Sequence, residues 1–499
     1  MVKGIVEGRS VQVHQLAVNC SAQDSVLRPE CFSQSLFSPR LWTLGISFVL
    51  SRSAAPFCHN VPVQLPEPFE SRMKRLLGAE YPEFKAALES SRALGLRVNP
   101  QKLSPSDVEA LPFLEGPIPW SRWGHYYQSD SRPSSHPFFL GGGFYLQEPS
   151  AMAVAELAAP KPGQWVIDLC AAPGGKTTHL ASFLDGQGVL IANEFTQSRV
   201  SRLMENVERW GARTTVLNNP IDRIARKWEG LFDVVVLDAP CSGEGMFRKD
   251  PEALSEWRES TPERLGRLQQ DLIEQAAKLT APEGTLVYST CTFSLEENEQ
   301  VIERFLKSHP EFRLESAHLH PAFSEGFGLP ETARLFPHKL QGEGHFMARL
   351  IRVDGEEGDV EYEEHARVSK TSLKAWEEFR KAQLDTELDG VVTERSGHLY
   401  LVREHLPSLS GLKVPAPGIY LGEVKFERFV PAKALAHHLN LQKVCRPLEV
   451  GTADAFKLEF GETLETTAPD GWHWLHFAGM GLTWGLVRKG RLKPTPLRV

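Results

Sequence analysis

Short apolar runs alternate with helical segments from residue 139 to about 352. Runs such as WVIDLCAA (165–172) and FDVVVLDAP (232–240) have the length and composition of buried strands. Between them lie segments with apolar residues at helical spacing, among them SRVSRLMENVERW (198–210) and ERLGRLQQDLIEQAAKLT (263–280). Strands separated by helices in this way predict βαβ units on a parallel sheet, and therefore an α/β domain over residues 139–352.

A shorter stretch with another pattern precedes this domain. FESRMKRLLGAEYPEFKAALE (69–89) has apolar residues at helical spacing, and a strand-like LGLRVNPQ (94–101) follows it. Residues 63–138 are therefore predicted to form a small α+β subdomain. Residues 1–62 show no sustained period. They are predicted to be either a disordered extension or sequence translated from upstream of the natural start, in both cases without a function.

The chain changes character twice beyond residue 352. Residues 353–369 include DGEEGDVEYEE, which is dense in carboxylates and predicts a solvated linker. Residues 370–412 and 413–499 have short strands and turn signals such as PAPG and APDG, which predict a first C-terminal subdomain and a mainly β domain. Because the middle domain has its own set of strands, a chain cut near Asp354 is expected to keep that domain folded.

Composition excludes several classes of protein. The seven cysteines form no CxxC pair, which argues against a disulfide framework and a zinc site and favours a reducing cytoplasm. The longest apolar run, Leu44 to Leu50, is too short to span a bilayer, and no signal peptide is recognisable at the start. The protein is therefore expected to be cytoplasmic and monomeric, with no metal and no membrane contact.

Charge alone is a weak guide to the partner. The formal charge of -8 argues against a nucleic-acid binder, but positive residues gather in the last quarter of the chain. This cluster comprises Arg488, Lys489, Arg491 and Lys493, close in sequence to Trp472, Trp474 and Trp484. Basic residues among aromatic ones would suit RNA, through phosphate contacts and base stacking.

A loop of small residues follows the first strand of the α/β domain. The segment DLCAAPGGKTT (168–178) lacks the GxGxxG of a dinucleotide site, and Cys170 stands where a Walker loop requires its first glycine. What remains is a strand–helix turn in which Ala171, Gly174 and Gly175 let backbone N–H groups approach a ligand closely. The triphosphate interpretation therefore fails, and another cofactor is expected.

Acidic residues follow the next three strands. Glu194 can accept hydrogen bonds from both hydroxyls of a ribose, and Asp222 and Asp238 lie beyond the third and fourth strands. This arrangement suits S-adenosylmethionine, although a helix-capping role for Glu194 and a turn role for Asp238 remain open. The predicted cofactor-binding residues are Cys170, Ala171, Ala172, Pro173, Gly174, Gly175, Lys176, Glu194, Asp222 and Asp238.

Cysteines follow two of the predicted strands, in VLDAPCSGEGMFRKDP and LVYSTCTFSLEENE. Together with IDLCAAPGGKTTHLA, these segments closely resemble the signature motifs of RNA cytosine-5 methyltransferases, and the resemblance covers roughly residues 65–350. The tail, with GLKVPAPGIYLGEVKFERFVPAKALA and LTWGLVRKGRLK, resembles the RNA-binding portion of the bacterial ribosomal small-subunit methyltransferase F group. The resemblance implies a Rossmann-like class I methyltransferase sheet, an RNA-binding N-terminal subdomain and a PUA-like C-terminal domain.

The resemblance also implies a cofactor, a substrate and residue roles. S-adenosylmethionine would methylate carbon 5 of a cytosine in small-subunit ribosomal RNA, with Cys291 as nucleophile, Cys241 assisting product release and Asp238 contacting the cytosine. The residues alone do not decide which thiol is the nucleophile, because cytosine-5 DNA methyltransferases have their nucleophile in a Pro–Cys pair such as Pro240–Cys241. Cys170 is expected to be a packing residue whose backbone faces the cofactor.

Two further expectations concern the surroundings of the thiols. Arg248 and Lys249 are candidates for RNA contacts, with ordinary surface charge as the alternative. Ser294 and Glu297 have the spacing of a capping box for a helix after Cys291.

A transfer-RNA substrate stays possible on the motifs. A non-catalytic RNA-binding factor is also possible, although such a protein would have no use for two placed thiols. An adenine amino-methyltransferase is disfavoured because that reaction needs no thiol.

Overall fold

The computed structural model describes residues 4–6, 9–11 and 65–495, and the chain divides into two compact units, Met1–His59 and Asn60–Val499. In the first unit, β1 (Gly4–Val6) and β2 (Arg9–Val11) pair as antiparallel strands. The remaining predictions for residues 1–62 lie outside the described residues. All structural results below concern the second unit, and no helix within its described part is long and apolar enough to cross a membrane.

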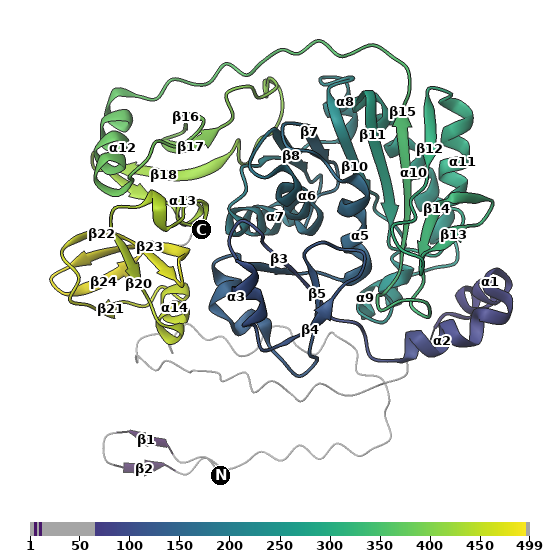
Figure 1. The fold of residues 1–499 in the computed structure, drawn as a ribbon, viewed down its shortest axis with the longest axis horizontal. Helices are drawn as coiled ribbons and strands as arrows, with labels where there is room; N and C mark the ends of the chain where they lie inside the picture. Colours follow the sequence, from purple (N-terminus) through teal and green to yellow (C-terminus); the bar gives the residue numbers. More distant parts are fainter. Residues whose placement is uncertain (1–3, 7–8, 12–64, 496–499) are drawn as a thin grey trace. The chain divides into compact units, whose positions relative to one another are not determined.

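A nine-stranded sheet forms the centre of this unit (Figure 1). Its parallel strands are β7 (Trp165–Asp168), β8 (Val189–Asn193), β9 (Thr215–Leu217), β10 (Phe232–Asp238) and β11 (Thr280–Thr290). The antiparallel remainder is β12 (Phe312–Glu315), β13 (Ser324–Gly326), β14 (Leu329–Leu335) and β15 (His345–Arg352). The order β13-β14-β15-β11-β10-β7-β8-β9, with β12 on β15, confirms the predicted Rossmann-like sheet. The order reverses between β7 and β10, where ligands of such sheets bind.

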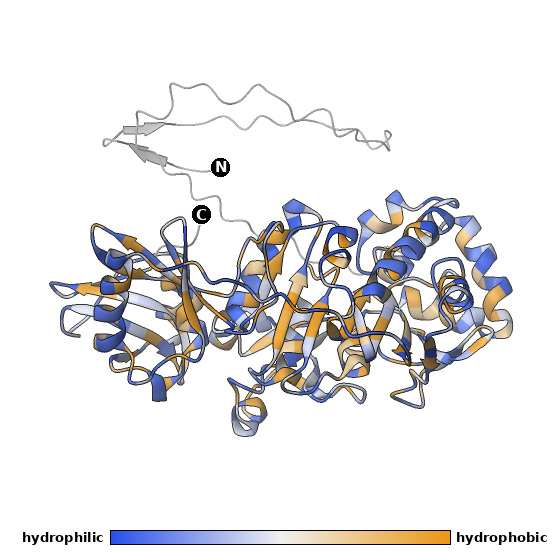
Figure 2. Ribbon diagram, turned by 90° about the horizontal axis from the view of Figure 1, so that it is seen from above, coloured by the Kyte–Doolittle hydropathy of each residue, from blue (hydrophilic) through white to orange (hydrophobic). Residues whose placement is uncertain are grey.

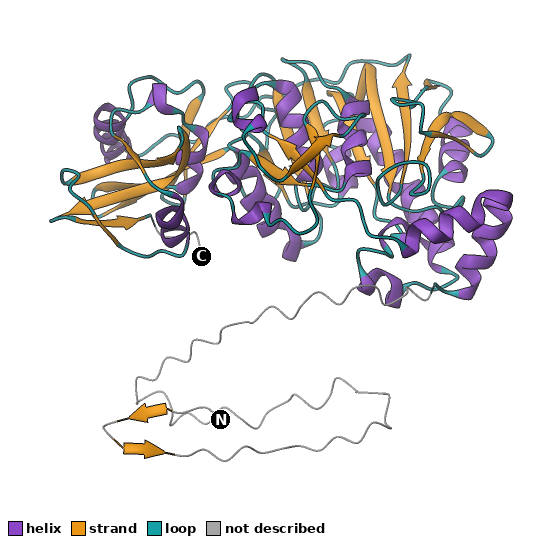
Figure 3. Ribbon diagram, turned by 60° about the horizontal axis from the view of Figure 1, so that its bottom comes forward, coloured by secondary structure: helices purple, strands orange, loops and turns teal. Residues whose placement is uncertain are grey.

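Apolar side chains of each strand point alternately to the two faces of the sheet, and helices cover both faces (Figure 3). Val234 and Val236 pack in one core with α5 (Pro149–Ala158) and α6 (Gly175–Leu184), whereas Val235 and Leu237 pack in the opposite core. That second core includes residues of α8 (Ile221–Ala225), α10 (Thr261–Leu279) and α11 (Glu299–Ser308). The strands are accordingly apolar on both faces and appear orange at the centre of Figure 2.

The N-terminal region is a helical hairpin followed by a small sheet. The hairpin consists of α1 (Glu67–Leu77) and α2 (Tyr81–Glu89), joined by a 3₁₀ turn. The sheet has the order β4 (Leu114–Pro117), β5 (Gly124–Tyr127), β3 (Gly95–Val98) and β6 (Phe144–Leu146), with α3 (Pro105–Glu109) and α4 (Pro137–Leu140) in its connections. The α+β character was predicted, but a boundary at residue 138 would cut β6 from its partner β3.

The C-terminal region contains two sheets. The first joins β16 (Val391–Arg395), β17 (His398–Val402), β18 (Ile419–Lys425) and β19 (Arg428–Pro431), and α12 (Lys370–Gln383) precedes it. The second has the order β20 (Pro447–Glu449), β22 (Gly471–Phe477), β23 (Met480–Arg488), β24 (Arg491–Pro494) and β21 (Leu464–Glu465), with α13 (Lys433–His438) and α14 (Thr452–Glu459) nearby in sequence. A boundary at residue 412 would divide the first sheet, because β17 pairs with β18.

Two of the three tryptophans of the tail do not lie where the sequence interpretation needs them, whereas Trp472 is only partly buried. Trp474 and Trp484 are completely buried in the core between the two C-terminal sheets. They are therefore unable to stack on RNA bases, whereas Arg488, Lys489 and Arg491 beside them are exposed. Burial explains the error, because tryptophan next to basic residues is a pattern shared by RNA-binding surfaces and the edges of ordinary cores.

Residues beyond 352 also complete the α/β domain. The Val216 amide donates to Ala416 O over 2.7 Å at the edge of β9, and Trp228 Nε1 donates to Ser408 O over 3.2 Å. Leu406 and Leu409 are buried in the core beneath α8 and α10. These contacts argue against the expectation that a chain cut near Asp354 keeps the domain folded, since the cut would uncover this core.

Leu409→Ala tests this packing. The side chain is 3% exposed, and its truncation is expected to lower the free energy of unfolding by about 2–5 kcal/mol, through lost burial and a residual cavity. Leu441→Ala, at a leucine that is 44% exposed, is the matched control and should cost about 0.5 kcal/mol or less. Urea denaturation measures both, and equal effects of the two substitutions would contradict the assignment of residues 406–416 to this core.

Candidate active site

The pairing of β10 with β11 brings the two predicted thiols together. The strands are parallel with Asp238 opposite Ser289, so Cys241 and Cys291 follow at similar distances beyond the same edge. Their Sγ atoms lie 3.3 Å apart, and the Cys291 amide N lies 3.3 Å from Cys241 Sγ. Both side chains are partly buried, and both are free thiols. The sequence thus predicted two members of one site.

The two thiols differ in their surroundings. The hydrogen bond with Cys291 raises the pKa of Cys241 well above its ordinary value, and burial and the nearby Glu297 carboxylate add to this effect. Cys241 therefore keeps its proton and is able to donate it to the sulfur of Cys291. Cys291 is the sulfur expected to act as the nucleophile.

An ion pair lies beside the thiols. Lys176 Nζ is 2.6 Å from Asp238 Oδ2, and the Ser289 hydroxyl donates to Oδ1 over 2.7 Å. Burial opposes ionisation of Asp238, but Lys176 and His345 outweigh it and lower the pKa of the carboxyl. The same pair raises the pKa of Lys176 against the effect of burial. Asp238 is therefore a carboxylate and Lys176 an ammonium.

Sequence reasoning missed half of this arrangement. Lys176 was expected to contribute only as part of the cofactor loop, yet its side chain crosses to Asp238. His345, at the start of β15, lies 3.7 Å from Asp238 Oδ1, and its buried Nε2 has no hydrogen-bond partner. The available signal was that Lys176 follows Gly174 and Gly175 where the loop after β7 enters α6, and this position does not specify its partner.

The loop between β7 and α6 is held from the side by α7 (Gln197–Trp210). Arg199 donates to Ala172 O over 2.6 Å, and Asn206 donates to Pro173 O over 2.7 Å. Gly174 has φ of 109°, a conformation that disfavours any side chain. Cys170 lies within the loop, and burial raises the pKa of its thiol, as suits a packing residue. The loop is therefore preformed for close approach of a ligand.

Glu194 follows β8 and is almost fully buried. Its Oε1 accepts a hydrogen bond from the Thr196 amide over 2.7 Å, a turn contact before α7, which has no side-chain cap. Its Oε2 lies 3.3 Å from Arg199 Nη1 but makes no hydrogen bond. Next to it, the ring of Phe195 is 68% exposed, a feature that sequence reasoning overlooked. A carboxylate oxygen without a hydrogen bond, beside an exposed ring, fits the ribose and adenine of S-adenosylmethionine.

Asp222 is less well placed for a ligand. It lies in the first turn of α8, about half exposed, and forms an ion pair of 2.8 Å with Arg226 one turn later. This pairing is typical of the exposed face of a helix. Its contact with the cofactor stays a prediction. No group of three or more His, Cys, Asp or Glu side chains in the described parts of the chain is arranged to hold a metal ion.

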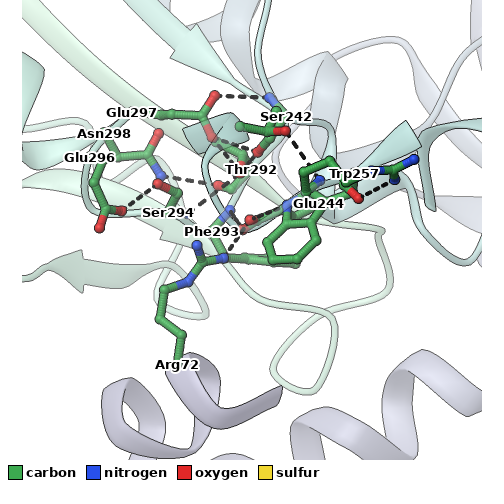
Figure 4. A network of polar contacts seen from close by, with 12 residues as sticks. Arg72, Ser242, Glu244, Trp257, Thr292, Phe293, Ser294, Glu296, Glu297 and Asn298 are labelled. Atoms are coloured by element: carbon green, nitrogen blue, oxygen red, sulfur yellow. Dashed lines mark hydrogen bonds and ion pairs between the residues drawn. The ribbon is translucent and has the colours of Figure 1, made fainter. Parts of the chain in front are cut away.

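A buried carboxylate connects the loops that carry the two thiols (Figure 4). Glu297 accepts hydrogen bonds from the Ser242 amide over 2.8 Å and from Gln269 Nε2 over 3.0 Å, and it also accepts one from the Ser242 hydroxyl. Ser242 and Thr292, the residues after Cys241 and Cys291, have their hydroxyl oxygens 2.7 Å apart. Glu297 therefore fixes the position of one thiol relative to the other.

This geometry replaces the predicted capping box. Ser294 donates to Glu296 over 2.7 Å, and α11 begins only at Glu299, with no side-chain cap from Asn298. The capping-box prediction was wrong because Glu297 turns toward the Cys241 loop instead of the helix end. The spacing of a serine and a glutamate cannot distinguish these two partners.

A second buried carboxylate ties the N-terminal hairpin to the site (Figure 4). Glu244 is fully buried and forms an ion pair with Arg72 of α1. It also accepts hydrogen bonds from Trp257 Nε1 over 3.0 Å and from the Phe293 amide over 3.3 Å. The hairpin is therefore attached to the loops of both thiols through one charge.

Comparisons with known proteins agree with this site. Residues 155–351 match the profile described as 16S rRNA methyltransferase RsmB/F, residues 65–149 match the N-terminal domain of 16S rRNA methyltransferase RsmF, and residues 378–439 match the first C-terminal domain of RsmF. Ribosomal RNA small subunit methyltransferase F of Vibrio campbellii is 33% identical over 393 residues, which cover 72% of this chain and 80% of that protein. The chain belongs to the RsmB/F family of methyltransferases.

Other relatives match in part. Small subunit methyltransferase F of Escherichia coli O17:K52:H18 is 36% identical over 304 residues, covering 58% of this chain and 63% of that protein, so the match spans less than two thirds of its length. A methyltransferase homolog protein from Pyrococcus horikoshii is 27% identical, with a TM-score of 0.51, and covers 58% of this chain and 96% of that chain. NSun6 from the same organism, crystallised with SFG, is 24% identical with a TM-score of 0.52, over 58% of this chain and 99% of that chain, and supports the fold alone.

The RsmB/F assignment leaves the two predicted RNA contacts to be judged from geometry. Arg248 is almost fully buried, forms a 2.8 Å ion pair with Glu343 and donates to Ala87 O over 2.7 Å. Its guanidinium is thus engaged with the protein, which does not support the predicted RNA contact. Lys249 is exposed, and its contact with RNA stays a prediction.

The buried position of Glu297 gives a prediction about pH. Burial raises the pKa of Glu297 to about 7, against the hydrogen bonds from Ser242 that lower it. A raised pKa in the folded state means that stability is fully present below the unfolded pKa of about 4.5 and is lost as the pH rises through about 7. Glu297→Gln removes this ionisation.

Between about pH 5 and about pH 8, the stability of Glu297→Gln relative to wild type should therefore rise by roughly 1–3 kcal/mol. Denaturant unfolding at the two pH values measures the difference. Glu252→Gln, at an exposed glutamate of α9 (Pro251–Glu256), is the control and should show no such change. A pH-independent difference for Glu297→Gln would show that the residue does not titrate in this range.

Proposed function

We propose that this protein is an S-adenosylmethionine-dependent methyltransferase that forms 5-methylcytosine in small-subunit ribosomal RNA. The observation that carries the proposal is the pair of thiols 3.3 Å apart beside the Asp238–Lys176 ion pair. Core packing does not explain two thiols with this spacing beyond the carboxyl ends of neighbouring strands, because both side chains are only partly buried. The names of the relatives support ribosomal RNA as the substrate.

The proposed chemistry explains why a thiol is needed. Carbon 5 of cytosine is a weak nucleophile, and addition of the Cys291 thiolate to carbon 6 makes carbon 5 electron-rich. When bound, S-adenosylmethionine supplies the methyl group that carbon 5 takes. Loss of the proton from carbon 5 to a base then restores the double bond as the sulfur of Cys291 leaves carbon 6. Cys241, which keeps its proton, is placed to protonate the departing thiolate.

The ion pair has separate tasks in this proposal. The carboxylate of Asp238 would accept a hydrogen bond from the exocyclic amine of the cytosine, and the Lys176 ammonium would stabilise the negative charge that develops on the ring during addition. Because each group keeps the other ionised, neither task requires a proton transfer within the pair. The residues proposed to hold the cofactor are the loop 170–176 and Glu194, with the Phe195 ring against the adenine. We also propose that the enzyme acts in the cytoplasm as a monomer.

Substitutions of the two thiols should separate their roles. Cys291→Ala is expected to abolish methyl transfer and to form no covalent adduct, because no other group is placed to attack carbon 6. Cys241→Ala should still add to the ring but release the product slowly, so a denaturant-resistant protein–RNA complex should accumulate. A denaturing gel with labelled RNA measures both. If the complex accumulates with Cys291→Ala instead, Cys241 is the nucleophile. If both variants keep full activity, the proposed mechanism is excluded.

Glu194→Ala tests the cofactor site. Loss of a charge-assisted hydrogen bond to the ribose should weaken S-adenosylmethionine binding by about 1.5–3 kcal/mol, measured by calorimetry. Glu205→Ala is the matched control, since this glutamate lies on the exposed face of α7, the helix that follows Glu194, and pairs with Arg202. Unchanged affinity in Glu194→Ala would remove this residue from the proposed site.

A further inference from the structure

A cavity of about 440 Å³ lies at the end of the sheet opposite the thiols. Its walls include residues 185–188, which precede β8, and residues 211–213, which precede β9, whereas Cys241 and Cys291 follow their strands. Gln101 and Lys102 from the N-terminal region and residues 388–389, 403, 437–440, 443 and 479–481 from the C-terminal region also line it. It is therefore a separate site, built jointly by three parts of the chain.

The charged groups of the cavity are unbalanced. Arg213, Arg403 and Lys443 face Asp185 and Asp389 there, and Lys102, whose pKa burial lowers to about 7, adds positive charge below that pH. Asp389 serves two arginines, with Oδ2 at 2.7 Å from Arg213 and at 3.4 Å from Arg403. Lys102 donates to two backbone carbonyls, Gly141 O and Arg209 O, and the ion pairs of the described residues include none for it. The cavity therefore carries a surplus of positive charge.

The cavity also contains an N–H donor that lacks an acceptor. The Nε atom of Arg403 is buried and has no hydrogen-bond partner, although its Nη2 donates to Gly186 O. Burial lowers the pKa of Arg403 to about 10, and the neighbouring Arg213 adds to this effect. Lys443 makes no ion pair among the described residues. A buried N–H group without an acceptor costs about 1–3 kcal/mol, so an anion in this place would be stabilised.

We infer that this cavity binds a phosphodiester group of the RNA strand, at a distance from the cytosine that reacts. Guanidinium groups match phosphate oxygens in geometry, and ammonium groups add charge. A continuous strand must enter and leave its site, and the walls permit this because Gln101, Asp185, Gly186 and Asp389 are exposed to solvent. The inference rests on the proposed RNA substrate and adds a contact on the other end of the sheet.

Binding of the full-length protein to a fluorescein-labelled RNA, over a salt series, tests the inference. Lys443→Gln and Arg403→Gln should each weaken binding by about threefold to tenfold, and each should lower the slope of log Kd against log salt by about 0.7–0.9. Lys370→Gln, at an exposed lysine that begins α12, is the matched control and should keep the wild-type affinity and slope. Thermal melts check the fold. Because Lys443 has no ion pair to lose, its variant keeps the test valid if Arg403→Gln unfolds.

Two outcomes would overturn the inference. One is a wild-type affinity and slope in Lys443→Gln. The other is thermal stabilisation by inorganic phosphate that these substitutions abolish while RNA binding is unchanged, which would indicate a site for a small anion. Bisulfite sequencing of the same RNA separates this test from the proposed function. If the wild type methylates the RNA but the substitutions leave RNA binding unchanged, only the inferred phosphodiester site is refuted. If the substitutions weaken RNA binding but the wild type methylates no cytosine, only the proposed methyltransferase activity is refuted.

Discussion

The parallel register of β10 and β11 is the constraint on which the site depends. Setting Asp238 opposite Ser289 places a carboxylate, a hydroxyl and two thiols beyond one edge of the sheet. A shift of one residue would turn the side chains of a strand to the other face, and the alternating cores on both faces forbid it. Packing of valines and leucines far from any chemistry therefore determines the distance between the thiols.

Buried carboxylates fix the loops around the thiols, whose approximate positions follow from the strand register. Glu297 connects the residues after the two thiols, Glu244 links their loops to Arg72, and Glu299 pairs with Arg334 through two hydrogen bonds. Burying a charge costs stability unless it is paired, so apolar residues would stabilise these positions more simply. Their contribution is directional, because each carboxylate fixes backbone and side-chain donors in one arrangement. The pKa of Glu297, raised to about 7, is the sign of that cost.

The sequence predicted those features that depend on neighbours along the chain. The strands, the helices and the positions of both cysteines followed from periodicity and motifs. Contacts between distant segments could not be predicted in this way. Lys176 and Asp238 are 62 residues apart, Glu297 could equally have capped a helix, and Trp484 looked like a surface residue because basic residues surround it in sequence. The packing of Ser408 and Ala416 against the α/β domain needed the full topology as well.

In the proposed mechanism Cys291, and not Cys241, bonds to the pyrimidine. RNA carrying 5-fluorocytosine tests it most directly, because fluorine at carbon 5 cannot leave as a proton would, so the covalent adduct persists after methyl transfer. Digestion of the trapped wild-type complex with protease and nuclease, followed by tandem mass spectrometry, locates the nucleotide. We expect a methylated fluorocytidine on the peptide that contains Cys291. The same nucleotide on the peptide that contains Cys241, or no modified peptide despite active methylation of ordinary RNA, would contradict it.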